Sequence, residues 1–188
     1  MLRRSPPTLL RRMCTKAAAD EDLLLHYRRL SRMYRYAPVN AHERYDSRVE
    51  VGAGRAIVSA PTKAEYNHAA FALHGSSYFK LLDDAAFFAA QSTNKEAFVV
   101  TTSFTTYITR AVDPTVVPFL KATGRVTSAT KSLIVAEASV VQPDGVEVGR
   151  GSGTFMPHPK FALPSMPLYA DDASYPFTDE DKVLPAVL

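Results

Sequence analysis

The residues best suited to chemistry in this sequence are a histidine–glycine pair and an aspartate that follows it. His74 and Gly75 begin the segment HGSSYFKLLDDAAFFAA, in which Asp83 is one of three charged residues. Apolar residues surround the helix that this segment would form, which is the pattern of a buried helix. Such a helix is too short and too charged to span a membrane. The segment therefore predicts a turn that opens into a buried helix carrying a carboxylate.

The three charges on this helix have different partners. Lys80 and Asp84 are four residues apart, so they can form an ion pair on one face of the helix. That pair leaves Asp83 without a local partner. An unpaired carboxylate on a buried helix is unfavourable, and such groups are more often functional than structural. The structural alternative is that Asp83 caps a backbone group or pairs with a distant residue such as Arg110 or Arg125, and that His74 and Gly75 only form a turn.

The composition is that of one folded domain. The chain has 188 residues, of which 46% are apolar, and this is enough for one hydrophobic core. Its single cysteine, Cys14, excludes an intramolecular disulfide, and no Cys/His group has the spacing of a zinc site. We also find no glycine-rich phosphate loop, nucleophile elbow or helix-turn-helix motif. The sequence predicts a fold held by packing and a chemistry that needs no metal or cofactor.

The net charge of +3 comes from the N-terminus. Residues 1–19 contain five basic and no acidic residues, so the remaining chain carries 17 basic and 19 acidic residues. This distribution does not favour nucleic-acid binding. Arg-rich, acid-free N-termini with Ser, Thr and scattered Leu are typical of mitochondrial transit peptides. We expect residues 1–19 to direct the chain to the mitochondrial matrix and to be cleaved between Met13 and Asp20. The alternative is a basic tail that carries no targeting signal.

An N-terminal helical extension is predicted over residues 20–42. Residues 20–35 have apolar residues at helical spacing, with acids first and bases last, and Pro38 ends the pattern. The basic face of this helix is expected to be solvated. It consists of Arg28, Arg29, Arg32 and Arg35.

The remaining elements predict an α+β domain. Residues 44–60 form a first strand, bent or split into a hairpin at Gly52-Ala53-Gly54, and a short helical piece precedes His74. After the buried helix, four segments rich in Val, Thr and aromatic residues are expected to be consecutive antiparallel strands. They cover residues 97–112, 119–127, 132–141 and 146–156. One buried helix and these strands predict an antiparallel sheet wrapped around that helix.

The C-terminal tail, residues 158–188, is Pro-rich and acidic and shows no periodicity. Such a segment is either disordered or extended along the surface of a neighbour. The residues expected to make the latter contact are aromatic: Phe161, Tyr169, Tyr175 and Phe177.

The order of these elements resembles the hotdog-fold thioesterases, and specifically the phenylacetic-acid-type acyl-CoA thioesterase group. The resemblance covers residues 45–157. It rests on the HG turn with an acid nine residues on, the strands FVVTTSFTTYITRAV and LKATGRVTSATKSLIVAEASVV, and the closing segment VEVGRGSGTFM. It implies a hotdog domain over residues 43–157, in which an antiparallel sheet wraps around a long central helix. It also implies an acyl-CoA substrate and a homodimer, or a dimer of dimers, with two active sites at the seam.

The resemblance assigns roles to individual residues. His74 would shape the turn, the backbone N–H of Gly75 would point at the thioester oxygen, and Asp83 would activate water or attack the acyl carbon. Ser76 stands where the motif usually has a second glycine, and a serine there can cap the helix. His68 stands where relatives commonly have Asn or Gln.

Other substrate contacts are implied on either side of the helix. Asn67 or His68 would supply a hydrogen bond that positions water. The Ser or Thr that assists the acid in some relatives would fall at Thr101 or Thr102, next to Val100. The acyl pocket would be lined by aromatic side chains across the seam. The candidates are Tyr78, Phe87, Phe88 and Tyr107.

The helix length has a consequence for any thioester chemistry. The first N–H groups of a helix lack intrahelical partners and can stabilise an oxyanion, while a carboxylate on the other side of the acyl carbon acts as base or nucleophile. Nine residues of helix place His74 about 13 Å from Asp83. We therefore expect one subunit to supply Gly75 and another to supply Asp83.

Two other functions compete with hydrolysis. A non-catalytic hotdog subunit or assembly factor of a mitochondrial complex would use the basic N-terminal helix and the acidic tail to bind partners. A hotdog dehydratase is disfavoured because its histidine in a Phe-Pro-Gly setting is absent from this sequence.

Overall fold

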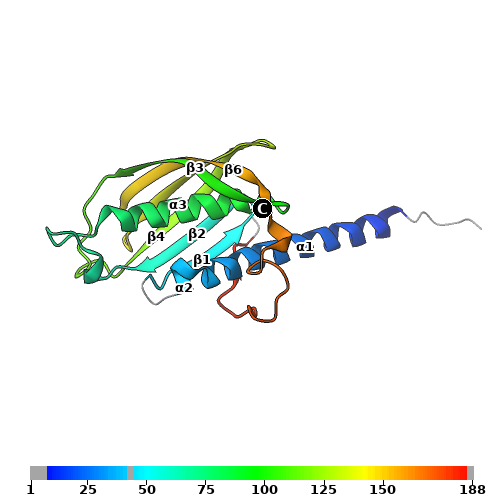
Figure 1. The fold of residues 1–188 in the computed structure, drawn as a ribbon, viewed down its shortest axis with the longest axis horizontal. Coiled ribbons are helices and arrows are strands. Elements are labelled where there is room, and N and C mark those ends of the chain that lie inside the picture. Colours follow the sequence, from blue (N-terminus) through cyan, green and yellow to red (C-terminus); the bar gives the residue numbers. More distant parts are fainter. Residues whose placement is uncertain (1–7, 42–44, 186–188) are drawn as a thin grey trace, which may run out of the picture.

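A computed structural model describes residues 8–41 and 45–185 of the chain, with side chains from residue 18 onward. A long helix, α3 (Gly75–Gln91), runs along one face of a seven-stranded sheet. Figure 1 shows the sheet curving around this helix. The predicted α+β architecture, an antiparallel sheet wrapped around a long central helix, is therefore confirmed.

The helix α3 is buried because its residues are small or apolar where they meet the sheet. Ala85 and Ala86 are fully buried. Gly124 faces them from the sheet, and a Cβ added to it would lie 2.1 Å from the carbonyl oxygen of Ala85. Any larger residue at position 124 would force the helix away, so this glycine sets the distance between helix and sheet.

The strand order of the sheet is β3-β6-β5-β4-β2-β1-β7. All neighbouring pairs are antiparallel except β1 with β7, which is parallel. The strands are β1 (Arg48–Gly52), β2 (Arg55–Pro61), β3 (Ala97–Ile108), β4 (Phe119–Ala129), β5 (Ile134–Val141), β6 (Glu147–Ala162) and β7 (Lys182–Val183). The first predicted strand is thus a hairpin, and β6 continues six residues beyond the predicted end at Met156.

The prediction that the last four strands pair consecutively is wrong for β3. Its partner is β6, whereas β4 pairs with β2 and β5. The connection over residues 109–118 carries the chain past β6 and β5 to β4 in the middle of the sheet, and β3 remains an edge strand. The other edge strand, β7, has two residues and is followed by Pro185, which blunts it. Among the strands in the described ranges, only β3 presents a long open edge.

The segment before α3 contains less helix than predicted. It holds the single 3-10 turn η1 (Ala64–Tyr66), followed by a tight loop closed by a bridge between Asn67 and Leu73. Phe71 has a φ of 61° in this loop, a left-handed conformation that an aromatic residue adopts only under strain.

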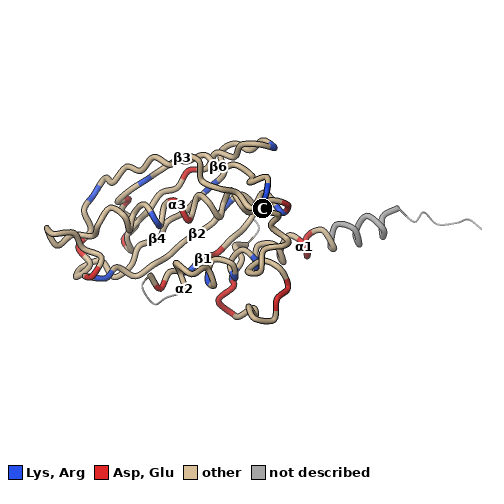
Figure 2. Tube along the Cα trace, viewed as in Figure 1, with Lys and Arg blue, Asp and Glu red and all other residues tan. Residues whose placement is uncertain are grey.

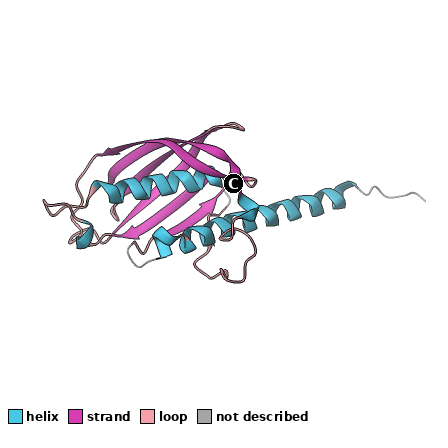
Figure 3. Cartoon of the chain, viewed as in Figure 1, coloured by secondary structure: helices cyan, strands magenta, loops and turns pink. Residues whose placement is uncertain are grey.

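The N-terminal helix α1 (Thr8–Tyr36) starts earlier than predicted, and the short helix α2 (Pro38–Ala41) follows it. Residues 1–7 of the predicted transit peptide lie outside the described residues. Figure 3 shows α1 beside the β1 end of the sheet, with its N-terminal part projecting away. None of the helices described in the two ranges is long and apolar enough to cross a membrane.

Three residues of the predicted basic face of α1, Arg29, Arg32 and Arg35, are covered by the C-terminal tail, contrary to the prediction, whereas Arg28 is exposed as predicted. Arg32 is 2% exposed, and its guanidinium donates to the carbonyls of Tyr169, Ala170 and Tyr175. Arg29 pairs with Asp171 at 2.6 Å and Arg35 pairs with Asp181 at 2.9 Å. Figure 2 shows the acidic residues of the tail loop around the basic residues of α1.

The tail is therefore ordered up to Pro185, and it lies on α1 of its own chain through Tyr169, whereas Phe161 is exposed. After the 3-10 turn η2 (Leu163–Ser165) it loops around Arg32 and ends in β7 beside β1. Buried guanidinium groups need several acceptors, and an irregular loop has free carbonyls to supply them.

Candidate active site

The first candidate site residues lie at the beginning of α3. His74 is the N-cap of this helix, and its Nδ1 accepts a hydrogen bond from the N–H of Ser76 at 3.1 Å. The Ser76 hydroxyl lies 2.8 Å from the same nitrogen. The backbone N–H of Gly75 makes no hydrogen bond within the described part of the chain. This N–H is therefore a free donor at the positive end of the helix dipole.

Gly75 is covered by the end of β3. A Cβ at this position would lie 3.2 Å from Cδ1 of Ile108. Ile108 is itself 49% exposed. The free donor thus lies beside an apolar side chain at the last residue of the open edge strand.

The second group of candidate residues lies two turns further along α3. Asp83 is partly buried, and the Thr101 hydroxyl donates to its Oδ1 at 3.1 Å. The neighbouring hydroxyl of Thr102 instead bonds the carbonyl of Thr154 at 3.0 Å. Of the two threonines predicted to assist the acid, only Thr101 contacts Asp83.

A β-bulge explains this choice. The register of β3 with β6 shifts between Thr101 and Ser103, so that Thr102 is an extra residue. With this insertion Thr101 and Phe104 both face α3 although they are three residues apart. Without the bulge, strict alternation would place one of them on the outer face.

The environment of Asp83 favours its protonated form. Burial raises the pKa of Asp83 from 3.8 to about 6, and the charge of Asp84 adds to this effect. The hydrogen bond from Thr101 and the charge of Lys80 act in the opposite direction on this pKa. A carboxyl group with a pKa near 6 can exchange protons at neutral pH, as a general base requires.

The structural alternatives for Asp83 find no support in its contacts. Lys80 pairs with Asp84 at 2.5 Å, as predicted. Arg125 pairs with Glu137 at 3.1 Å. Neither Asp83 nor Arg110 forms an ion pair within residues 8–41 and 45–185.

An aromatic pair lies between the two groups. Phe79 on α3 is 45% exposed, and its ring meets that of Phe104 on β3 edge-on at 5.7 Å. Phe104 packs over Gly151 and Gly153 of β6, where an added Cβ would be 2.6 and 2.4 Å from the ring. We did not predict Phe79, Phe104 or Ile108. The alternating glycines in VGRGSG were the available signal, because they leave room for a ring from the next strand.

Several predicted residues lie away from these groups. The amide of Asn67 donates to the Phe71 carbonyl at 3.1 Å, and His68 is exposed and accepts from the N–H of Ala70. Both side chains hydrogen-bond within the loop before α3, and neither hydrogen-bonds to Asp83 or Gly75 within the described residues. Among the predicted pocket residues, Tyr107 is on the outer face of the sheet, opposite Arg150. Tyr78 and Phe88 are buried, and Phe87 is partly buried.

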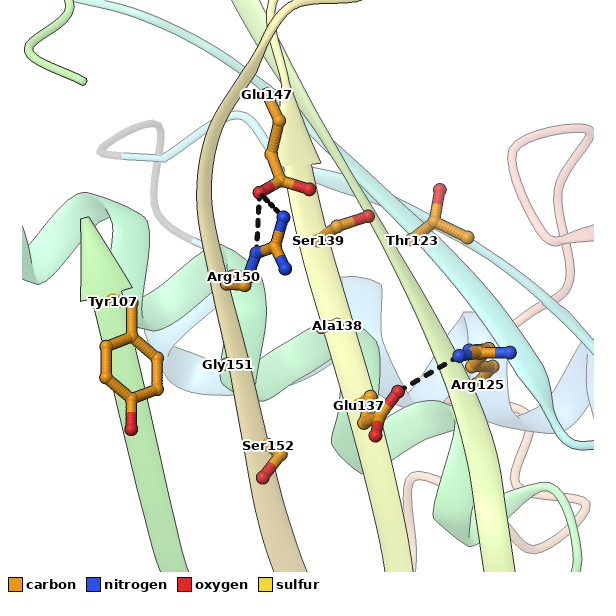
Figure 4. Close-up of a pocket in the computed structure, with 10 residues that line it drawn as sticks. All are labelled: Tyr107, Thr123, Arg125, Glu137, Ala138, Ser139, Glu147, Arg150, Gly151 and Ser152. Carbon is orange, nitrogen blue, oxygen red and sulfur yellow. Dashed lines mark hydrogen bonds and ion pairs between the residues drawn. The ribbon is translucent and has the colours of Figure 1, made fainter. Parts of the chain in front are cut away.

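A hollow of about 400 Å³ is on that outer face (Figure 4). Two ion pairs, Arg125–Glu137 and Arg150–Glu147, cross it. The exposed Glu137 alternates with Ala136 and Ala138, which are buried on the α3 side. The hollow is therefore separated from Gly75 and Asp83 by the sheet. No cluster of His, Cys, Asp and Glu in the described residues could bind a metal.

Comparisons with known proteins agree with this fold. The sequence model of the Thioesterase superfamily matches residues 72–149. Conserved protein PA5202 from Pseudomonas aeruginosa is similar at 27% identity and a TM-score of 0.59, over 68% of this chain and 99% of that one. The PaaI protein from the phenylacetic acid degradation operon of E. coli is similar at 19% identity and a TM-score of 0.62, over 73% and 98%.

A third similar structure holds a ligand. The smu.793 protein from Streptococcus mutans UA159, bound to acetyl CoA, has 20% identity and a TM-score of 0.54, over 62% of this chain and 90% of that one. No curated protein sequence matches the chain. Together with the family match, these structures confirm the predicted hotdog fold and the resemblance to this thioesterase group.

The raised pKa of Asp83 predicts a pH-dependent gain in stability for Asp83→Asn. Because the folded state binds this proton more tightly, ionised Asp83 destabilises the fold above pH 6, whereas at pH 3.5 and below both states are mostly protonated and the effect nearly disappears. The shift corresponds to about 3 kcal/mol, and solvent screening of this partly exposed group reduces the expected gain to about 1–2 kcal/mol. Urea unfolding at pH 7.5 and pH 3.5 measures it. An equal effect at both pH values would contradict the raised pKa.

Proposed function

We propose that this chain, which has the hotdog fold and matches the Thioesterase superfamily over residues 72–149, hydrolyses acyl-CoA thioesters at two sites formed between the subunits of a homodimer. The observation that carries the proposal is the arrangement along α3 and β3. The free N–H of Gly75 lies at the Ile108 end of β3, and Asp83 lies at the Thr101 end. These two ends flank the open edge of the sheet.

One subunit does not hold both groups close enough for one substrate. Gly75 and Asp83 are eight residues apart on a straight helix, which corresponds to about 12 Å. A thioester carbonyl would need both groups within about 3 Å. Either the substrate uses one group only, or a second chain supplies the other.

Pairing of two β3 strands would bring the groups together. Long open edge strands readily pair with a second chain. Consider an antiparallel pair of β3 strands related by a two-fold axis, in which Thr105 pairs with its own copy. Ile108 is three positions from Thr105, and Thr101 is also three paired positions from it, because the bulge residue Thr102 is not counted. Ile108 of one subunit therefore lies opposite Thr101 of the other. Gly75 then faces Asp83 of the partner subunit. The exposed Phe79 and Ile108 would be covered in the same contact.

The chemistry then follows from these positions. The thioester carbonyl oxygen accepts a hydrogen bond from Gly75, and Asp83 of the partner subunit removes a proton from water as the water oxygen adds to the acyl carbon. The tetrahedral oxyanion collapses and breaks the C–S bond, and the sulfur takes the proton from Asp83. The products are a carboxylic acid and CoA. In the other route that this geometry allows, Asp83 attacks the carbon itself and water hydrolyses the resulting anhydride.

The substrate class is supported by the comparisons and by the apolar groups at the site. A similar fold binds acetyl CoA in the Streptococcus mutans protein. In this chain Phe79 and Phe104 lie between the two catalytic groups and offer an apolar surface to an acyl group. Thr101 would orient the carboxylate of Asp83 toward the acyl carbon.

We further propose that the protein works in the mitochondrial matrix after loss of residues 1–19. Residues 18–24 are exposed, and the first side-chain contact between α1 and the domain is the ion pair of Asp22 with Lys95. Cleavage before Asp20 would leave the packing of α1 intact. N-terminal sequencing of the protein purified from mitochondria is expected to find a first residue between Cys14 and Asp20. An intact Met1 in matrix protein would contradict cleavage.

Complementation between two inactive variants tests the shared site. Gly75→Pro removes the backbone N–H at a position where proline is tolerated, the first of a helix, and His74 already has the extended backbone that precedes proline. The added ring requires a small shift of the half-exposed Ile108 side chain. Asp83→Asn removes the base. We expect each variant to lose about 10²-fold or more in kcat toward a panel of acyl-CoAs, followed by release of free thiol. In mixed dimers one of the two sites is intact, so activity returns.

The control is Asp179→Asn, which changes an exposed acid in the tail and is expected to keep full activity. A lack of activity in mixed dimers would place both groups in one subunit's site. Folded wild-type protein that hydrolyses none of the acyl-CoAs would favour the alternative, a non-catalytic hotdog subunit.

A further inference from the structure

Lys80 has two carboxylates within reach on its own helix. It precedes Asp83 by three residues and Asp84 by four, and both spacings allow an ion pair on a helix. In the structure its Nζ binds Oδ2 of Asp84 at 2.5 Å, while Asp83 bonds Thr101. If Lys80 turned to Asp83 instead, it would occupy the carboxylate needed for catalysis.

The contacts on the Asp84 side come from outside the matched part of the chain. The Tyr34 hydroxyl lies 3.0 Å from the same Oδ2 of Asp84 and 2.7 Å from Oγ of Ser47. Tyr34 is 1% exposed and packs edge-on against Phe88 of α3 at 5.2 Å. Burial raises the pKa of Tyr34, so the hydroxyl stays protonated and can donate a hydrogen bond to Asp84.

Aromatic rings complete the site that holds Lys80. Its ammonium is 5.4 Å from the ring centre of Tyr34 and 5.2 Å from that of Tyr45. Cations are attracted to aromatic faces at such distances. The lysine is mostly buried there, with a side-chain exposure of 14%. Asp84 and two rings thus bind the ammonium on the side of α3 that faces α1.

We propose that Tyr34 and Asp84 are positioning residues that hold Lys80 away from Asp83 and so keep Asp83 free to act on the thioester. This inference rests on the proposed function. It assigns a role to α1, which lies outside residues 72–149 of the family match. Tyr34 is held in place in turn by its neighbours Arg32 and Arg35, which bind the C-terminal tail.

The groups that act on Asp83 are few. Burial and the charge of Asp84 raise its pKa, whereas the Thr101 hydroxyl and the charge of Lys80 lower it. Tyr34 of α1, with Ser47 and Tyr45 from the segment before β1, contacts Asp84 or Lys80 or each other and acts on Asp83 only through those two residues. Loss of the Asp84 charge and capture of Lys80 by Asp83 would both lower the pKa of Asp83. A test must therefore separate these two effects.

The decisive comparison is between Asp84→Asn and the double variant Lys80→Met/Asp84→Asn. In the single variant Lys80 is released to Asp83, and we expect the pKa of Asp83 to fall by about one unit or more and kcat to fall about tenfold with KM little changed. In the double variant no lysine remains to occupy Asp83, so both the pKa and kcat are expected to recover. Tyr34→Phe, which removes only the hydroxyl, is expected to lower the Asp83 pKa and kcat in the same direction as Asp84→Asn, but by less.

Carbon-13 NMR titration of the Asp83 carboxyl group and the pH profile of kcat provide the readouts. Lys121→Met, which removes an exposed lysine of β4, is the control for the loss of a positive charge. A double variant as impaired as Asp84→Asn, or an unchanged Asp83 pKa in Asp84→Asn, would overturn the proposal. The NMR titration does not need turnover. If the wild type hydrolyses nothing but Asp83 titrates as expected, the positioning holds and the proposed function fails.

Discussion

The straight helix α3 is the constraint on which the rest of the structure depends. It separates Gly75, which carries the free N–H, from Asp83 by about 12 Å along the helix axis. No side-chain rotation closes this distance. Gly124 seats this helix against the sheet at a single distance, so the two groups also have fixed positions relative to β3. A single chain is then half of each of two sites. Dimerisation, in this account, completes the chemistry instead of merely adding stability.

The edge strand β3 runs past both groups, so a second chain that pairs with β3 would lie next to Gly75 and Asp83. Its bulge at Thr102 turns Thr101 toward Asp83 and Phe104 toward Phe79, while its last residue, Ile108, covers Gly75. The opposite edge of the sheet is closed by the chain's own tail through β7. The tail also fixes α1, and α1 carries Tyr34 to Asp84. The N-terminal helix and the C-terminal tail therefore both support α3 on the side that carries Asp84, and this is the function that we propose for them.

Patterns local in the sequence predicted most of the fold. The apolar segment after His74 is the central helix, and the segments rich in Val and Thr are strands. Long-range partners were not predictable: strand periodicity does not reveal that β3 pairs with β6, and a bulge leaves no mark that would favour Thr101 over Thr102. The contacts of Arg32 could not be predicted for another reason: its acceptors are backbone carbonyls, which every residue has and which therefore leave no signal in the sequence. The alternating glycines of β6 were readable, and they would have pointed to Phe104.

The most direct measurement of the central claim is disulfide cross-linking across the β3 edge in a Cys14→Ala background. The account predicts that Thr105→Cys alone forms a covalent dimer under mild oxidation, because the two-fold axis passes through that residue. Ser103→Cys and Tyr107→Cys, each on the same exposed face, should cross-link only when the two variants are mixed. A protein that stays monomeric, or efficient cross-linking of Ser103→Cys with itself, would contradict the shared site.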